Sequence, residues 1–213
     1  MKLIYIFSGL LFFLTACESC DPPPSYCERV FQFDIPFSLS PEKDTFLIGD
    51  TIWVESEYEK MLLDKNSGDY IDIGKFDFRV KTGVIRIDTL GYDSNPDNFE
   101  VLDIIGKFEV QPLGQNLSII HIVYEDDNTG RSVKAGIILN ATGIFHVSFT
   151  NIRPDIEDDI HLIESSCNQK ISLSYNLNEG RENNYYLEEY DENEVPSEED
   201  FRAFGGYNFV VIE

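Results

Sequence analysis

The chain has 213 residues, of which 42% are hydrophobic, and it carries a formal net charge of −23 at pH 7. The hydrophobic content is too high for a disordered protein, and the length allows one large domain or two small ones. An acidic chain of this kind repels phosphate backbones, which argues against nucleic acid as a partner.

The N-terminus has the three regions of a secretory signal peptide in the expected order. Lys2 precedes an apolar run over residues 3–14, and compact residues follow before Cys17. As a helix this run would rise only about 18 Å, whereas the hydrocarbon core of a bilayer is roughly 30 Å thick. We therefore expect residues 1–16 to be a signal peptide, because the run is too short for a transmembrane anchor.

Leu14, Thr15, Ala16 and Cys17 resemble the lipobox of bacterial lipoproteins. The resemblance implies that the chain is cut before Cys17 and that this cysteine carries several acyl chains, palmitate among them. Each buried methylene contributes about 0.8 kcal/mol, so several chains hold a protein on the membrane almost permanently. The expected partner is thus the membrane, through a lipid anchor, and no cofactor is expected.

Residues 17–27 are expected to form a lipidated tether. The run from Pro22 to Pro24 favours extended polyproline II, which would hold the folded body away from the bilayer. Surface-exported lipoproteins of the Bacteroidota type carry acidic residues just after the anchor, and Glu18 and Asp21 match this pattern in part. The resemblance favours the outer membrane or cell surface over the periplasmic face.

The body, residues 28–213, alternates between apolar and polar residues with a period of two, which is typical of strands. In the first run, five large apolar residues alternate with polar ones, and Pro36 indicates an edge strand because it lacks an N–H donor. These five are Phe31, Phe33, Ile35, Phe37 and Leu39. Similar runs cover residues 51–57, 70–73, 76–80, 84–89, 107–110, 118–124, 132–139, 144–150, 171–177 and 207–212.

Turn and cap residues divide these runs. Residues 66–68 and 126–130 are rich in Asn, Asp and Gly and predict hairpins. Residues 118–124 are apolar on both faces, which predicts a strand at the centre of a sheet. Ser197 is a candidate helix N-cap, followed by acidic residues and then by Gly205, so one short helix is expected near the C-terminus.

Residues 44–56 read DTFLIGDTIWVES, with a Gly-Asp bend between two short strands. They resemble the opening strands of immunoglobulin-like bacterial surface domains, and a similar stretch in uncharacterised Bacteroidota-type envelope lipoproteins. The expected fold is therefore all-β, an immunoglobulin-like or related β-sandwich with one short C-terminal helix. A second domain could begin near the polar stretch 151–166, and an extended single domain is equally defensible.

Three cysteines remain once Cys17 carries lipid, so at most one intramolecular disulfide forms. Cys27 precedes Phe31 by four residues, and Cys167 precedes Ile171 by four. Both cysteines therefore share the parity of apolar strand residues and should face inward if the strands extend back to them, which favours a bridge between them. A local bridge from Cys20 to Cys27 and a state without any bridge are the alternatives.

The remaining motifs do not predict a catalytic, cofactor or metal site. Residues 93–98 resemble the first half of a calcium loop but lack its glycine and its final glutamate, so we expect a polar loop. The acidic stretch 188–200 lacks a turn that would make its carboxylates converge. We expect core packing for the tyrosines of residues 183–190, with a ligand platform as the alternative. The histidines have no metal-ligand spacing and are expected to be packed or at the sheet surface; they are His121, His146 and His161.

Together these features predict a lipid-anchored envelope protein that acts as a binding or adhesion module for glycan or protein. The alternative is a structural or accessory subunit of an envelope complex that needs no small ligand. An enzyme is not expected, because no catalytic motif appears in the sequence.

Overall fold

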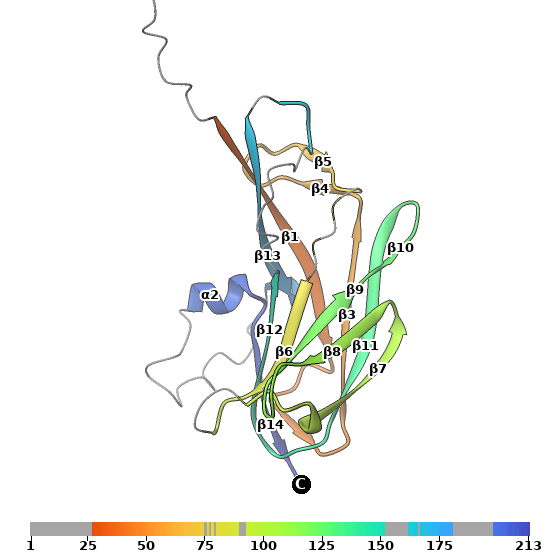
Figure 1. The fold of residues 1–213 in the computed structure, drawn as a ribbon. Helices are drawn as coiled ribbons and strands as arrows, with labels where there is room; N and C mark the ends of the chain where they lie inside the picture. The colour runs from red at the N-terminus through yellow and green to blue at the C-terminus, as the bar shows by residue number, and fades with distance from the viewer. Residues whose placement is uncertain are drawn as a thin grey trace, which may run out of the picture.

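A computed structural model describes residues 27–74, 76, 78, 80–89, 93–151, 162–165, 167–180 and 198–213. The expected signal peptide, Cys17 and the tether as far as residue 26 lie outside these residues. The described chain forms two six-stranded sheets and a separate two-stranded hairpin. Figure 1 shows the two sheets face to face, with the C-terminus at the end of the molecule opposite the start of β1.

The first sheet has the strand order β10, β11, β3, β1, β13, and β7 also pairs with β11. Most of its pairs are antiparallel, but β1 and β13 run parallel, with Phe31 opposite Ile171. Its strands are β1 (Glu28–Ser40), β3 (Thr51–Glu59), β7 (Phe99–Ile105), β10 (Glu125–Asp126), β11 (Gly130–Leu139) and β13 (Asn168–Leu177).

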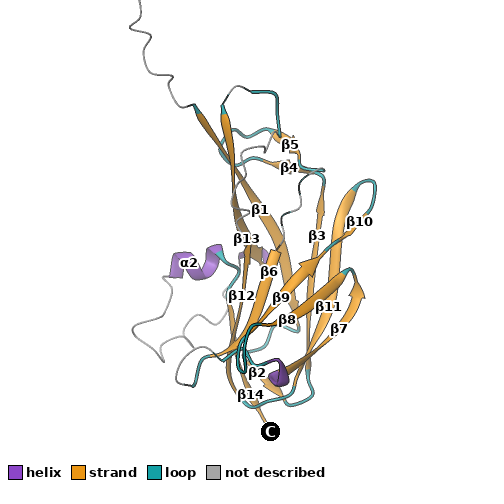
Figure 2. Cartoon of the chain, viewed as in Figure 1, coloured by secondary structure: helices purple, strands orange, loops and turns teal. Residues whose placement is uncertain are grey.

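The second sheet has the order β2, β14, β12, β6, β9, β8. The separate hairpin of β4 and β5 lies near the start of β1 (Figure 2). The strands of the second sheet are β2 (Thr45–Leu47), β6 (Val80–Arg86), β8 (Lys107–Pro112), β9 (Ser118–Val123), β12 (Gly143–Asn151) and β14 (Tyr207–Ile212). The remaining elements are β4 (Met61–Leu63), β5 (Tyr70–Asp72), the 3-10 turns η1 (Pro96–Asn98) and η2 (Asn178–Gly180), and the helix α2 (Glu198–Ala203).

The core lies between the two sheets and is rich in aromatic rings. Alternate residues of β1 are buried, so the period-two pattern of the sequence corresponds to one inward face. Phe37 of β1 stacks on Phe149 of β12, with ring centroids 4.0 Å apart, and this contact joins the two sheets. Both rings are at most 3% exposed. The all-β sandwich predicted from the alternation is thus confirmed.

The helix and hairpin predictions are also confirmed. Helix α2 has the expected acidic residues in its first turn, and Gly205 adopts a left-handed φ of 59° shortly after it. Residues 66–68 connect β4 to β5, and residues 126–130 connect β10 to β11. In the second turn, the Asp127 carboxylate accepts hydrogen bonds from the backbone N–H groups of Thr129 and Gly130, both at 2.7 Å.

Three predictions about strands were wrong. Strand β9 is next to the edge strand β8 rather than central, and Val123 at its end is 44% exposed. Strand β1 lies between β3 and β13, and Pro36 is tolerated because β1 pairs with β3 only over Ser38–Ser40. The runs expected at 76–80 and 84–89 contribute to one strand, β6, which continues through Gly83.

Cys27 and Cys167 form a disulfide that joins the first ends of the parallel strands β1 and β13. Because Glu28 lies opposite Asn168 in this pair, each cysteine comes directly before a matched position. The inward orientation was expected only if the strands extend back to the cysteines, but β1 begins at Glu28 and β13 at Asn168, and Cys27 is exposed and Cys167 half-buried. Strands from both sides of residues 152–161 belong to the same two sheets.

Asp64 fastens the β4–β5 hairpin to the sandwich and is only 1% exposed. Its carboxylate accepts hydrogen bonds from Gln32 N at 2.8 Å and from Ser67 Oγ at 2.7 Å, with further bonds from Asn66 N and Ser67 N. Burial acts to raise the pKa of Asp64, but these hydrogen bonds together outweigh burial and the pKa is lowered.

A lowered pKa in the folded state means that Asp64 stabilises the fold above its ordinary pKa of about 3.9, and that this contribution is lost as the pH falls through the lowered value. We expect Asp64→Asn to cost about 2 kcal/mol of unfolding free energy at neutral pH, because the charged acceptor is lost. Urea unfolding from pH 7 down to about pH 2.5 measures this. The two proteins should converge at the acid end, and curves that stay parallel would contradict the assignment.

Candidate functional site

A groove of 720 Å³ opens at the side of the sandwich where β8 and β9 end one sheet and the β10–β11 hairpin ends the other. This volume is within the range of roughly 300–1,000 Å³ that is usual for ligand sites. The groove is lined by Val80, Glu109, Val110, Gln111, Pro112, His121, Ile122, Val123, Tyr124, Asp126 and Arg131.

The groove follows the edge of the sheet rather than one face of it. Four consecutive residues of β8, from Glu109 to Pro112, line it, and so do the four residues from His121 to Tyr124. Successive side chains of a strand point to opposite faces, so a lining of consecutive residues indicates a hollow at the margin of the sheet rather than over one face. Among the described residues, β8 pairs only with β9, and its other backbone edge has no strand partner.

The groove combines an apolar floor with a few polar groups. Val80 and Ile122 are buried and Val110 is half-buried, and these three provide the apolar contact. His121 Nε2 and Gln111 Oε1 lie 2.7 Å apart on the wall. Such a mixture suits recognition of a ligand that is part apolar and part polar.

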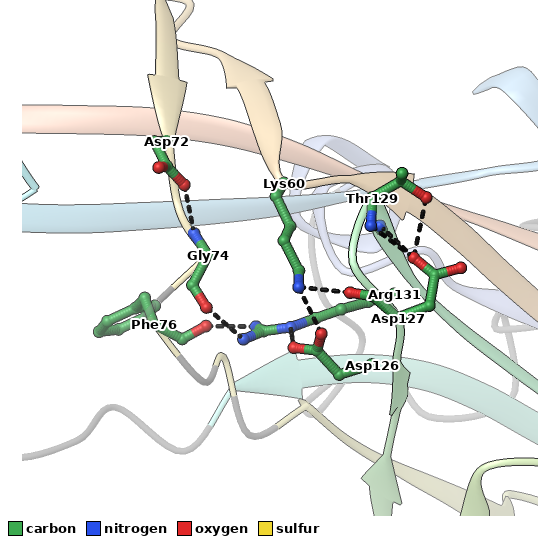
Figure 3. A network of polar contacts seen from close by, with 9 residues as sticks. Lys60, Asp72, Gly74, Phe76, Asp126, Asp127, Thr129 and Arg131 are labelled. Carbon is green, nitrogen blue, oxygen red and sulfur yellow. Dashed lines mark hydrogen bonds and ion pairs between the residues drawn. The ribbon is translucent and has the colours of Figure 1, made fainter.

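Arg131 lines the groove, and its side chain is only 10% exposed. Figure 3 shows the polar contacts that hold it. Its Nε is 3.1 Å from Asp126 Oδ2, and its guanidinium also donates to the backbone carbonyls of Gly74 and Phe76. Burial acts to lower the pKa of Arg131, but hydrogen bonds to Asp126 and to Tyr58 outweigh burial and the pKa is raised. The guanidinium therefore stays charged, and its hydrogen bonds hold it in one position, which makes this wall of the groove rigid.

Lys60 extends the same network at the surface. Its Nζ lies 2.5 Å from Asp126 Oδ1 and also donates to the carbonyl of Asp127. The pKa of the Asp126 carboxyl is lowered, first by its hydrogen bond with Lys60 and then by that with Arg131. As Figure 3 shows, the end of β3, the segment after β5 and the β10–β11 hairpin all meet at these charges.

Tyr124 closes the inner side of the groove. Its hydroxyl donates to Ser56 Oγ at 3.2 Å, and its ring packs edge-on against Tyr58 with centroids 5.2 Å apart. Burial raises the pKa of Tyr124 well above its ordinary value, so its hydroxyl stays neutral. The groove therefore presents a neutral phenol beside an apolar floor.

The structure does not bring the predicted histidines together. His121 lines the groove, whereas His146 lies on β12 with its Nδ1 2.7 Å from Asn208 Oδ1. His161 lies outside the described residues.

In the loop 93–98, the Asn95 and Asp93 side chains accept from nearby backbone N–H groups, at 3.0 and 3.1 Å, and so form turns. Within the part of the chain that the structure describes, no group of His, Cys, Asp and Glu could hold a metal ion.

Several other predicted features lie outside the described residues, among them Cys20, the aromatic stretch 183–190 and the acidic stretch 188–197. The groove was missed from the sequence. Its residues were assigned to separate strands, and nothing in the sequence shows that β8 and the β10–β11 hairpin lie on the same side of the sandwich.

The fold defines the chain as an all-β sandwich protein with mixed sheets. A comparison with protein-family models found no match, and a comparison with curated proteins found none either. No helix in the described ranges is long and apolar enough to cross a membrane.

Proposed function

We propose that this protein is a lipid-anchored binding module of the cell envelope, at the outer membrane or cell surface, and that it holds a segment of a partner protein in the β8–β9 groove. Binding, rather than catalysis, is its role. The groove along a sheet edge is the observation that carries this proposal, and the lipobox resemblance supports the anchor.

A polypeptide fits the groove better than a compact ligand does. On the outer edge of β8, Phe108 N donates to Asp103 Oδ1 at 2.9 Å and Pro112 has no N–H, so an extended peptide can pair there only over a short stretch, through the N–H of Val110 and the backbone carbonyls. Val110 and Ile122 line the groove beside this edge and provide apolar contact for alternate side chains of the peptide. The acidic net charge of the chain favours a neutral or basic partner segment.

The proposal predicts that a charge in the groove will remove the partner. Val123 lines the groove and is 44% exposed, whereas Leu117, the residue directly before the same strand, is 42% exposed and is not among the groove residues. Val123→Lys should lower partner recovery from detergent-solubilised native membranes at least about tenfold, since an ammonium group has to be desolvated in the contact. Leu117→Lys is the matched control and should recover the partner as the native protein does. Equal recovery with both variants would count against the groove.

A further inference from the structure

A second hollow lies on the outer side of the first sheet, where β1 and β3 separate. Strand β1 first runs beside β13 alone, over Glu28–Phe37, and then pairs with β3 only over Ser38–Ser40, opposite Trp53–Glu55. A pocket of 310 Å³ opens in this split. Most of its exposed lining surface is apolar, although most of the lining residues have polar side chains; they are Pro36, Phe37, Ser38, Glu55, Ser56, Glu57, Asn176, Asn178 and Glu179.

Two residues at the rim of this pocket have an uncommon backbone conformation. Asn178 and Glu179 are consecutive residues without glycine's freedom, yet both adopt left-handed φ angles, of 48° and 59°. Such conformations persist only where the surroundings impose them, and they cluster at binding sites. Here the Asn178 side chain, 3% exposed, accepts a hydrogen bond from Leu39 N at 2.8 Å and so fixes the turn beside the pocket.

Trp53 lies next to the pocket on the same outer face, two residues before Glu55. A β-carbon at Gly136, its cross-strand neighbour, would come within 3.0 Å of Trp53 Cζ3 and 3.3 Å of Cε3. The indole therefore covers the glycine backbone and occupies the space that a side chain would need. Because the inner side of the ring rests on the sheet, its outer side faces away from the sandwich core, and Trp53 is half-buried.

Polar residues occupy the cross-strand positions next to Trp53 and Glu55. Ser40 lies opposite Trp53, Ser38 lies opposite Glu55, and Lys134 Nζ is 3.0 Å from Glu55 Oε2 across the next strand. Same-face positions on a strand are about 7 Å apart, so the ring and the pocket adjoin each other. The surface thus joins an aromatic platform to a pocket of carboxylate, amide and hydroxyl groups.

We propose that the Trp53 platform and the adjoining β1–β3 pocket form a site for a neutral saccharide. The C–H groups on one face of a sugar ring are polarised positive and match the negative face of the indole. Sugar hydroxyls donate to the acceptors of Glu55, Asn176 and Glu179, and the amide of Asn176 donates in return. Anionic sugars are repelled by the three glutamates of the pocket.

This site shares no lining residue with the β8–β9 groove, although Tyr124 of the groove donates to Ser56 of the pocket, and different variants and ligands test the two proposals. Trp53 is the single tryptophan of the chain, and its fluorescence therefore reports on this site alone. The test titrates the full mature chain with maltohexaose, cellohexaose, mannohexaose and chitohexaose while following tryptophan emission. At least one of these should give a saturable change in emission.

Substitutions then test whether the change in tryptophan emission is caused by binding in the pocket. Asn176→Ala, at an exposed position of the pocket, should weaken the binding that causes this change about fivefold, because one hydrogen bond is lost. Asn128→Ala is the matched control, since Asn128 is exposed at the tip of the β10–β11 turn and should leave the affinity unchanged. Calorimetry on Trp53→Leu should show at least tenfold weaker binding, with circular dichroism as the check on folding.

Three results would overturn the proposal. One is emission that responds to none of the four saccharides. Another is a saccharide affinity of the Asn176→Ala variant that equals that of the native protein. The third is a change in emission caused by a lysine-rich peptide but by no saccharide, which would assign the pocket and its glutamates to cationic ligands.

Discussion

Cys17→Ser will move the protein from the membrane fraction to the soluble fraction, and we expect this to be the largest effect of any single substitution. The lipobox resemblance makes Cys17 the acylated residue, and serine has no thiol to accept the lipid. Each acyl methylene contributes about 0.8 kcal/mol of membrane binding, so losing several chains removes nearly all of it.

The matched control is Cys20→Ser, which removes a cysteine three residues further along and should leave the protein on the membrane. Fractionation of cells labelled with a palmitate analogue measures both quantities, the acylation and the location. A Cys17→Ser protein that still takes up the label and sediments with membranes would show that the anchor is elsewhere.

Removing the Cys27–Cys167 disulfide should lower the free energy of unfolding by about 3–5 kcal/mol. The bridge closes a loop with a sequence separation of 140 residues, and cross-links over long loops remove the most entropy from the unfolded chain. It also joins the first ends of β1 and β13, close to the residues where the expected tether enters the fold. If the protein is held by the proposed anchor, a force on the tether would therefore act on the disulfide before it acts on the sheet.

Urea unfolding of the Cys27→Ser/Cys167→Ser double variant measures this contribution. A reducing agent should bring the native protein to the stability of the double variant and leave the double variant unchanged. Cys20→Ser should be as stable as the native protein. If Cys20→Ser lost as much stability as Cys167→Ser, the bridge would involve Cys20 and the pairing in the structure would be wrong.

The strands were predictable because burial has a period of two along them. Residues 207–212 were predicted as a strand and are β14, with inward residues such as Phe209 fully buried. The same parity placed Cys27 and Cys167 at equal distances before Phe31 and Ile171, which lie opposite each other in the parallel pair. Local spacing thus contained real information on register.

Strand prediction failed where apolar side chains are exposed to solvent. Strand β7 was missed because Leu102 and Ile104 are apolar yet 46% and 53% exposed, which hides the alternation. Strand β9 was placed at a sheet centre because Ile119 and Val123 are apolar on its outer face, although Val123 is largely exposed.

The candidate sites could not be predicted at all, for a related reason. The β8–β9 groove depends on how far β10 and β11 lie from β8, and the saccharide pocket depends on the short pairing of β1 with β3. Both are properties of strand order and strand divergence, which residue patterns do not specify. Trp53 alone left a signal, as the single tryptophan of an otherwise ordinary strand.

The central claim is that an anchored protein holds a partner polypeptide in the β8–β9 groove, and photo-crosslinking in intact cells tests it most directly. A photoreactive phenylalanine analogue replaces Val123 in the groove or, as the control, Leu117 outside it. We predict that position 123 gives one discrete adduct in the membrane fraction, that protease treatment degrades its partner portion, and that position 117 gives none. Equal labelling from both positions, no adduct from position 123, or an adduct whose partner portion only glycosidases remove would contradict the account.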